Sequence, residues 1–169
     1  IADYHFAPTS LSRKSLEKEN ISKNVFVVGN TVVDALLLGL ENLKARSIDF
    51  SNEFCYLDFS KPVVLVTAHR RESFGKPFEN ICDAILNIKQ QHPEAQFVYP
   101  VHFNPNVREV VNRKLAEQPG IYLIEPLDYA RLIWLMEKSN VILTDSGGIQ
   151  EEAPALGKPV LVMREVTER

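Results

Sequence analysis

The sequence predicts an α/β fold in which a parallel sheet is covered by helices on both faces. Short apolar runs of strand length alternate with segments whose apolar residues recur at helical spacing, almost from end to end. The clearest run, residues 63–67, is continuous and rich in valine, as expected for a strand buried on both faces. Alternation of strand and helix favours right-handed crossovers, which place neighbouring strands parallel.

The first 61 residues are expected to supply two strands, two helices and a connection. In order, they are a strand at residues 4–7, a polar helix from Thr9 or Ser10 to about Glu19, a strand at 25–28 and an apolar helix from Thr31 to about Leu40. Thr9 and Ser10 are residue types that cap helix starts, and Gly29 ends the second strand. Residues 47–61 have no clear period and are expected to be a connection.

The rest of the chain continues the same alternation. The predicted elements are strands at 63–67, 96–99, 121–124, 141–144 and 160–163, with helices at about 77–92, 106–116, 129–136 and directly after Gly148. Pro77 suits a first helical turn, and Pro93 should end that helix. Pro154 conflicts with the last helix because it lacks an N–H group, so we expect a kink there or a division into two short pieces.

Composition limits the class of protein. The chain of 169 residues is 45% hydrophobic and 24% charged, as in ordinary globular domains. Its formal charge of −3 argues against a nucleic-acid partner, and no apolar stretch approaches the ~20 residues of a membrane helix. Cys55 and Cys82 lack metal or redox spacing, which fits a reducing, cytoplasmic setting. Because the chain opens with Ile1-Ala2-Asp3 and no methionine, we expect a piece of a longer protein.

The stretch from Thr144 to Glu152 predicts an anion-binding turn. A buried-type strand passes through Ser146-Gly147-Gly148 straight into a helix. A helix start leaves N–H groups unpaired with the positive end of the dipole behind them, and phosphates bind there. The glycines lack Cβ atoms that would keep a phosphate away. Glu151 or Glu152 would then reach ribose hydroxyls, so the pattern indicates a nucleotide. A tight turn with a solvated acidic face is the open alternative.

A cationic cluster follows the strand at 63–67. His69, Arg70 and Arg71 leave this strand together, in a chain that is acidic overall. Ligands of parallel α/β sheets collect beyond the carboxyl ends of the strands, where the glycine turn also lies. Arginine forks bind phosphates and histidine exchanges a proton near neutral pH, so the cluster favours a diphosphate. Alternatively, the arginines pair with carboxylates such as Glu72, and His69 only ends the strand.

Other motifs indicate little chemistry. His102 follows another strand, but a contact within its own loop explains it more simply than a ligand does. His, Cys, Asp and Glu residues show no metal-ligand spacing, so no metal is expected. The sequence has no nucleophile elbow, Walker loop or GxGxxG pattern, and we expect no cofactor.

Five motifs stand in order along the chain. They are VGNTVVDA at 28–35, TAHRRE at 67–72, HFNPNVRE at 102–109, DSGGIQEE at 145–152 and MREVTER at 163–169. Together they closely resemble the non-hydrolysing UDP-N-acetylglucosamine 2-epimerases over nearly the whole chain. One departure is Ser73, where the family usually has asparagine.

The resemblance implies a two-domain GT-B-type fold in which a UDP-sugar lies between two Rossmann-like halves. Residues 1–24 would be the tail of the first half. Residues 25–169 would form the hinge, near 28–34, and most of the second, UDP-binding half, in truncated form.

The resemblance also implies roles for individual residues. His69 would be catalytic and, with Arg70 and the Ser146-Gly147-Gly148 backbone, would bind the diphosphate. Glu152 would hold the ribose hydroxyls, and uracil would lie near Glu125-Pro126-Leu127.

The implied activity is isomerisation of UDP-N-acetylglucosamine to its manno isomer through elimination and re-addition of UDP. The carboxylates that move the C2 proton would lie in the missing half, so this piece alone should bind UDP weakly and not catalyse. The whole protein is expected to be a homodimer. A GT-B glycosyltransferase donor domain and a regulatory nucleotide-sugar-binding module stay open as alternatives.

Overall fold

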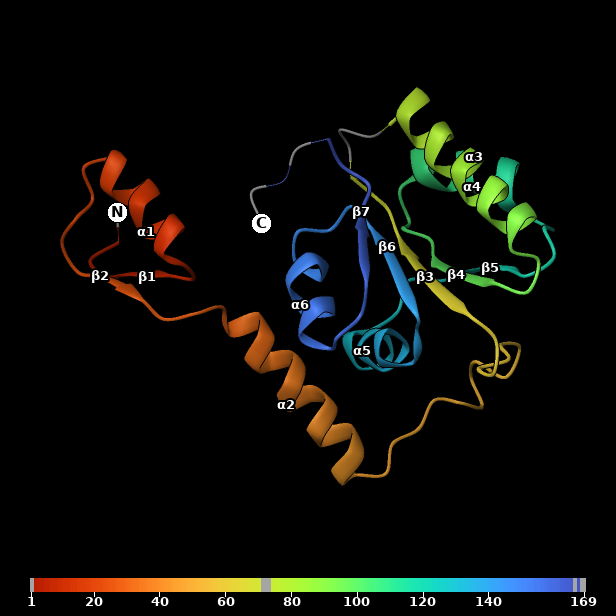
Figure 1. Cartoon of the computed structure of the whole chain (residues 1–169), viewed down its shortest axis with the longest axis horizontal. Coiled ribbons are helices and arrows are strands. Elements are labelled where there is room, and N and C mark those ends of the chain that lie inside the picture. Colours follow the sequence, from red (N-terminus) through yellow and green to blue (C-terminus); the bar gives the residue numbers. More distant parts are fainter. Residues whose placement is uncertain (1, 71–73, 166, 168–169) are drawn as a thin grey trace.

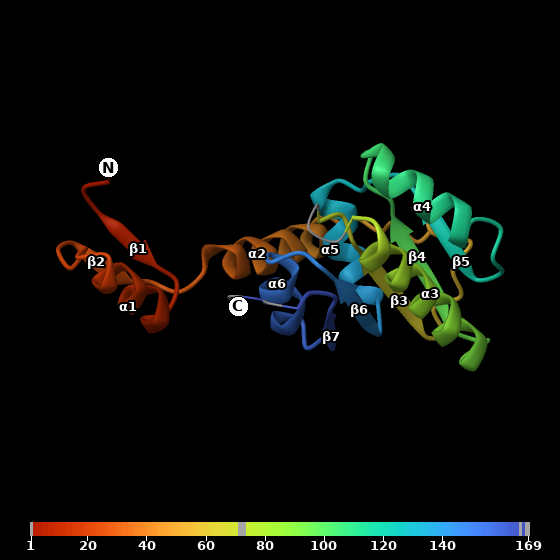
Figure 2. The same ribbon diagram turned by 90° about the horizontal axis from the view of Figure 1, so that it is seen from above.

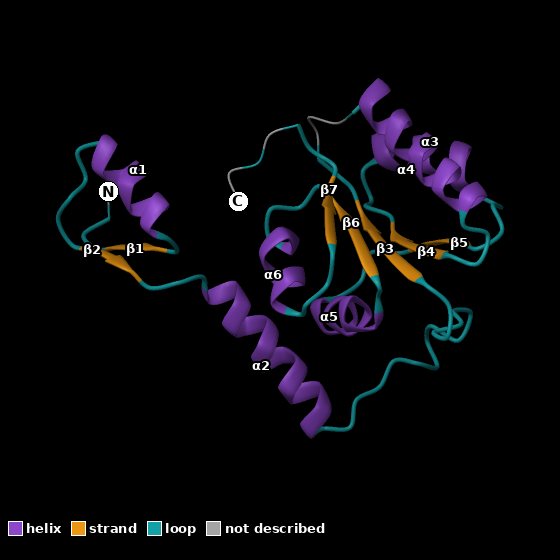
Figure 3. Ribbon diagram, in the orientation of Figure 1, coloured by secondary structure: helices purple, strands orange, loops and turns teal. Residues whose placement is uncertain are grey.

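The computed structural model describes residues 2–70, 74–165 and 167. Its elements are β1 (His5–Ala7), α1 (Ser10–Lys18), β2 (Val25–Val27), α2 (Thr31–Ala45), β3 (Val63–Thr67), α3 (Lys76–Gln91), β4 (Gln96–Pro100), α4 (Pro105–Leu115), β5 (Ile121–Ile124), α5 (Tyr129–Lys138), β6 (Val141–Thr144), α6 (Ile149–Ala155) and β7 (Val160–Val162) (Figure 3).

Five of the strands form one parallel sheet in the order β5-β4-β3-β6-β7. Alternate side chains of β3 enter two separate cores: Val63 and Leu65 pack with α2, α5 and α6, whereas Val64 and Val66 pack with α3 and α4. Figure 1 shows these helix groups on opposite faces of the sheet. The predicted parallel sheet with helices on both faces is confirmed.

The long helix α2 joins the sheet domain through a regular apolar stripe. Leu36, Leu40 and Leu43 recur at helical spacing and are all buried. Asn30 Oδ1 accepts the Val32 N–H at 3.1 Å and so caps the helix start. The helix runs beyond the expected end near Leu40 because Leu43 continues the stripe. Residues 47–61 contain no helix or strand, as expected.

The N-terminal unit, made of β1, α1 and β2, lies at the start of α2, beside the domain that contains the five-stranded sheet (the sheet domain; Figures 1 and 2). Here β1 pairs in parallel with β2, His5 opposite Val25, in a separate two-stranded sheet. Phe6 and Phe26 stack with ring centroids 6.0 Å apart. Val25–Val27 thus pairs with β1, although residues 25–169 were expected to form the hinge and the second unit. The assignment of the units to two halves of a larger fold stays a prediction.

Helix α6 is a single segment of seven residues, so of the two outcomes expected at Pro154, a kink or a division, the division is wrong. Pro154 falls in the last turn, and the helix ends at Ala155, one residue later. Gly157 then adopts φ +68° and donates its N–H to the Pro154 carbonyl at 2.9 Å. Among the helices of the described residues, none is both long and apolar enough to cross a membrane.

Candidate functional site

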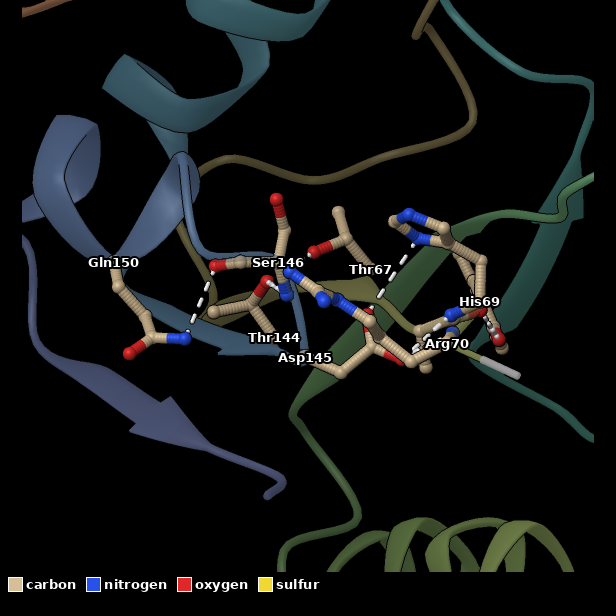
Figure 4. Close-up of polar contacts among 9 residues, drawn as sticks. Thr67, His69, Arg70, Thr144, Asp145, Ser146 and Gln150 are labelled. Carbon is tan, nitrogen blue, oxygen red and sulfur yellow. Dashed lines mark hydrogen bonds and ion pairs between the residues drawn. The ribbon is translucent and has the colours of Figure 1, made fainter. Parts of the chain in front are cut away.

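The polar segments that follow β3 and β6 meet at the carboxyl edge of the sheet. The two strands pair in parallel with Thr67 opposite Thr144, so the segments leave the sheet side by side. The Thr67 hydroxyl donates to Thr144 Oγ1 at 2.7 Å, and both side chains are buried. Figure 4 shows His69, Arg70 and Ser146 around this pair. The strand register therefore brings the two predicted polar segments into one site.

Asp145 connects the two segments. Its carboxylate is fully buried, and Oδ2 accepts the backbone N–H groups of His69 and Arg70, both at 2.7 Å. Its other oxygen, Oδ1, lies 3.5 Å from His69 Nδ1. No role was predicted for Asp145 from the sequence. The available signal was a carboxylate directly after a buried strand, because a charge at such a position requires partners.

The glycine turn offers backbone donors, but they are not the same three amides as expected. The Ser146 N–H already donates to Thr144 Oγ1 at 2.9 Å, so the expectation that this amide is available is wrong. Within the described part of the chain, the N–H groups of Gly147, Gly148 and Ile149 donate to no protein acceptor. Gln150 Nε2 donates to the Ser146 carbonyl at 3.2 Å and holds the turn. Three consecutive amides are thus left for an anion.

Glu152 lies beside this turn with its carboxylate largely buried. The Tyr129 hydroxyl donates to Glu152 Oε1 at 2.9 Å. Burial and this hydrogen bond raise the pKa of Tyr129 to about 12, so the phenol stays a donor at neutral pH. A Cβ atom built on Gly148 would lie 3.7 Å from Glu152 Oε2. The second carboxylate oxygen therefore borders the glycine turn.

His69 lies in the segment after β3, and its side chain is exposed. Its ring stacks on His102, with centroids 5.5 Å apart and an interplanar angle of 17°. His102 Nδ1 also accepts the Asn104 N–H at 3.1 Å, so the expected contact within its own loop is confirmed. Arg70 is half-buried and joins the site through its backbone. Arg71, with Glu72 and Ser73, lies outside the described residues.

The first of two hollows borders the glycine turn, and the second is lined by the residues expected to hold uracil. One, of about 380 Å³, lies between the N-terminal unit and the sheet domain and is lined by Gly148, Glu151 and residues 28–32. The other, of about 530 Å³, follows β5 and is lined by Glu125-Pro126-Leu127 and part of the 53–56 segment. Glu125 forms an ion pair with Arg108 at 2.5 Å. Within the described residues, no three His, Cys, Asp or Glu side chains gather as a metal site.

Comparison with known proteins gives one consistent family. The whole chain, residues 1–169, matches the family model described as UDP-N-acetylglucosamine 2-epimerase. The curated UDP-N-acetylglucosamine 2-epimerase of Escherichia coli (strain K12) is 52% identical over 174 residues, which cover 100% of this chain and 46% of that protein. The Campylobacter jejuni protein of the same name is 49% identical, again over 46% of its length. The chain thus spans about half the length of these curated relatives.

Comparison with solved structures gives the same family as the comparison of sequences. The Neisseria meningitidis UDP-GlcNAc 2-epimerase bound to UDP-GlcNAc superposes with a TM-score of 0.95 at 47% identity, over 99% of this chain and 46% of that one. A Staphylococcus aureus protein in complex with UDP has a TM-score of 0.87 at 45% identity, over 100% of this chain and 45% of its own.

Proposed function

This chain belongs to the UDP-N-acetylglucosamine 2-epimerase family, and we propose that it is the UDP-holding half of such an enzyme. The whole enzyme interconverts UDP-N-acetylglucosamine and UDP-N-acetylmannosamine. Because the chain spans about half of its relatives, the complementary half supplies the remaining catalytic groups. Family membership favours this function over a glycosyltransferase donor domain.

The diphosphate occupies the space between the glycine turn and His69. The observation that carries this proposal is that one buried carboxylate, Asp145, fixes the His69–Arg70 backbone beside a turn with amides free to donate. The N–H groups of Gly147 and Gly148 bind phosphate oxygens, with the Ser146 hydroxyl beside them, while His69 and the Arg70 guanidinium approach from the other side. Helix α6 is short, so the aimed amides contribute more than its dipole does.

The nucleoside extends away from this turn along the strand ends. Glu152 accepts hydrogen bonds from the ribose hydroxyls through Oε2, because Oε1 is held by Tyr129. Uracil lies in the hollow at Glu125-Pro126-Leu127. The hollow beside Gly148 leads toward the N-terminal unit and takes the sugar.

The reaction needs these donors most when the bond to UDP breaks. A base in the complementary half removes the C2 proton, the C1–O bond breaks, and its electron pair leaves with the diphosphate as a C1=C2 double bond forms. UDP then adds back to C1, and a proton returns to the opposite face of C2. Donors that are already aimed at the diphosphate bind it more tightly in the transition state, where its negative charge grows, than in the ground state. One such donor typically lowers the barrier by ~3 kcal/mol.

The proposal extends to the cellular location and the oligomeric state of the whole enzyme. We place it in the cytoplasm, consistent with Cys55 and Cys82 both being free thiols, and expect it to be a homodimer. Sedimentation of the whole enzyme as a monomer would contradict the second point.

An NMR titration of the ¹⁵N-labelled chain tests the proposed binding mode. Added UDP should shift the amide signals of Gly147 and Gly148 and the ring signals of His69, UMP should shift them less, and uridine should leave them nearly unchanged. His69→Gln should weaken UDP binding, whereas the matched change at the exposed His92 should not. Equal responses to UDP and uridine would contradict the proposed diphosphate site.

A further inference from the structure

The two oxygens of the buried Asp145 carboxylate have different surroundings, and only those of Oδ2 are explained by a structural role. Oδ2 already accepts two backbone N–H groups, from His69 and Arg70, and these fix the loop that follows β3. Oδ1 is equally buried, has no hydrogen-bond partner among the described residues, and lies 3.5 Å from His69 Nδ1. A buried carboxylate oxygen without a partner is costly, so its position beside a ring nitrogen requires an explanation.

The geometry limits which ring nitrogen of His69 can carry the proton. A carboxylate oxygen accepts hydrogen bonds and cannot donate them when ionised, so Oδ1 favours a proton on Nδ1. The distance of 3.5 Å is longer than the ~2.9 Å of a good N–H···O bond, so the two atoms are neighbours without a well-formed hydrogen bond. The His102 ring, stacked on His69 with centroids 5.5 Å apart, limits rotation of the His69 ring. Nε2 is then the nitrogen left to face a ligand.

We propose that Asp145 is a positioning residue: Oδ2 anchors the His69–Arg70 backbone, and Oδ1 holds His69 with Nδ1–H toward the carboxylate and Nε2 toward the diphosphate. When Nε2 takes up a proton, the buried carboxylate behind the ring stabilises the imidazolium that donates to the leaving diphosphate. The placement of the diphosphate rests on the proposed function. The orientation of the ring does not.

Asp145→Asn separates the two roles of the carboxylate. The His69 and Arg70 amides still need an acceptor, so the amide oxygen takes the place of Oδ2 and the NH₂ group faces Nδ1. Nδ1 must then accept, and the proton of the neutral ring moves to Nε2. Asp145→Ala, by contrast, removes the acceptor of both amides as well.

Ring ¹⁵N spectra of His69 in alkaline buffer, without ligand, read the protonated nitrogen directly. We expect Nδ1–H in the wild type and Nε2–H in Asp145→Asn, with hydrogen-exchange protection of the His69 and Arg70 amides kept in Asp145→Asn and lost in Asp145→Ala. The control Asp58→Asn alters a carboxylate that accepts the Ser60 N–H at 3.0 Å and leaves His69 unchanged. An Nε2–H ring in the wild type would overturn the proposal without any variant.

UDP affinity supplies the second readout. A charge-assisted hydrogen bond from His69 should become a neutral one in Asp145→Asn, which weakens UDP binding by about tenfold. An unchanged His69 tautomer in Asp145→Asn would overturn the positioning role. If the tautomer switches but UDP binds neither protein, the proposed function fails while the orientation of His69 by Asp145 is upheld.

Discussion

Replacing Gly148 with alanine separates ligand binding from folding. Gly148 has φ −64° and ψ −49°, ordinary helical values that alanine adopts without strain. A methyl group there would lie 3.7 Å from Glu152 Oε2 and 3.9 Å from Ser146 Oγ, which are normal contact distances. We therefore expect the free energy of unfolding to change by no more than ~0.5 kcal/mol. The fold itself does not require glycine at this position.

The same methyl group would stand where the proposed nucleotide meets Glu152. Losing one hydrogen bond to a charged group costs about 1.5–3 kcal/mol, which corresponds to roughly 10–150-fold weaker UDP binding. Titration calorimetry or NMR measures the affinity, and urea unfolding measures the stability.

Gly157→Ala, in the turn that follows the same helix, is the matched control. Gly157 has φ +68°, a left-handed conformation that costs alanine roughly 1 kcal/mol, and a new Cβ there meets no atom of the described residues within 4 Å. This variant should lose stability and keep its UDP affinity. Unchanged UDP affinity in Gly148→Ala, or a loss equal to that in Gly157→Ala, would refute the reasoning.

Three further predictions follow from the site and the core. Glu152→Gln keeps the hydrogen bond from Tyr129 but loses the negative charge, so UDP affinity should fall about tenfold with little change in melting temperature. Tyr129→Phe should reduce UDP affinity less. Calorimetry measures both variants. Burial raises the pKa of the Cys82 thiol to about 11, above the ~8.5 of an unfolded thiol. The free energy of unfolding should therefore fall as pH rises from about 8.5 to about 11. Cys82→Ala should reduce this fall, measured by urea unfolding at pH 8 and 10. The chain alone should form no manno isomer from UDP-N-acetylglucosamine, whereas the chain joined to the complementary part of the Neisseria meningitidis relative should; detectable turnover by the chain alone would count against the division of roles.

Local patterns carried most of the fold prediction. Continuous β-branched strands such as β3 and regular stripes such as that of α2 are strong periodic signals, and they predicted the parallel sheet and its helical layers. The end of α6 was harder to predict, because Pro154 indicates a kink or an end of the helix without showing which of the two occurs. The pairing of Val25–Val27 with β1 depends on a partner twenty residues away, which no local pattern specifies.

The candidate site, like the fold, could be predicted from the sequence only in part. The glycine turn and His69 stand at strand ends and could be predicted as neighbours once the sheet was taken as parallel. The use of the Ser146 amide by Thr144, and the contacts of Asp145 with the loop after β3, depend on the register that sets Thr67 opposite Thr144. That register is a contact between residues 77 apart in the chain. It could not be read from spacing or composition.

A crystal structure of the chain with UDP tests the central claim most directly. We predict that the diphosphate lies on the N–H groups of Gly147 and Gly148, within hydrogen-bond distance of His69 Nε2, and that Glu152 Oε2 contacts the ribose. UDP bound elsewhere on the sheet domain, or bound with its phosphates in solvent and those two amides unoccupied, would contradict the account.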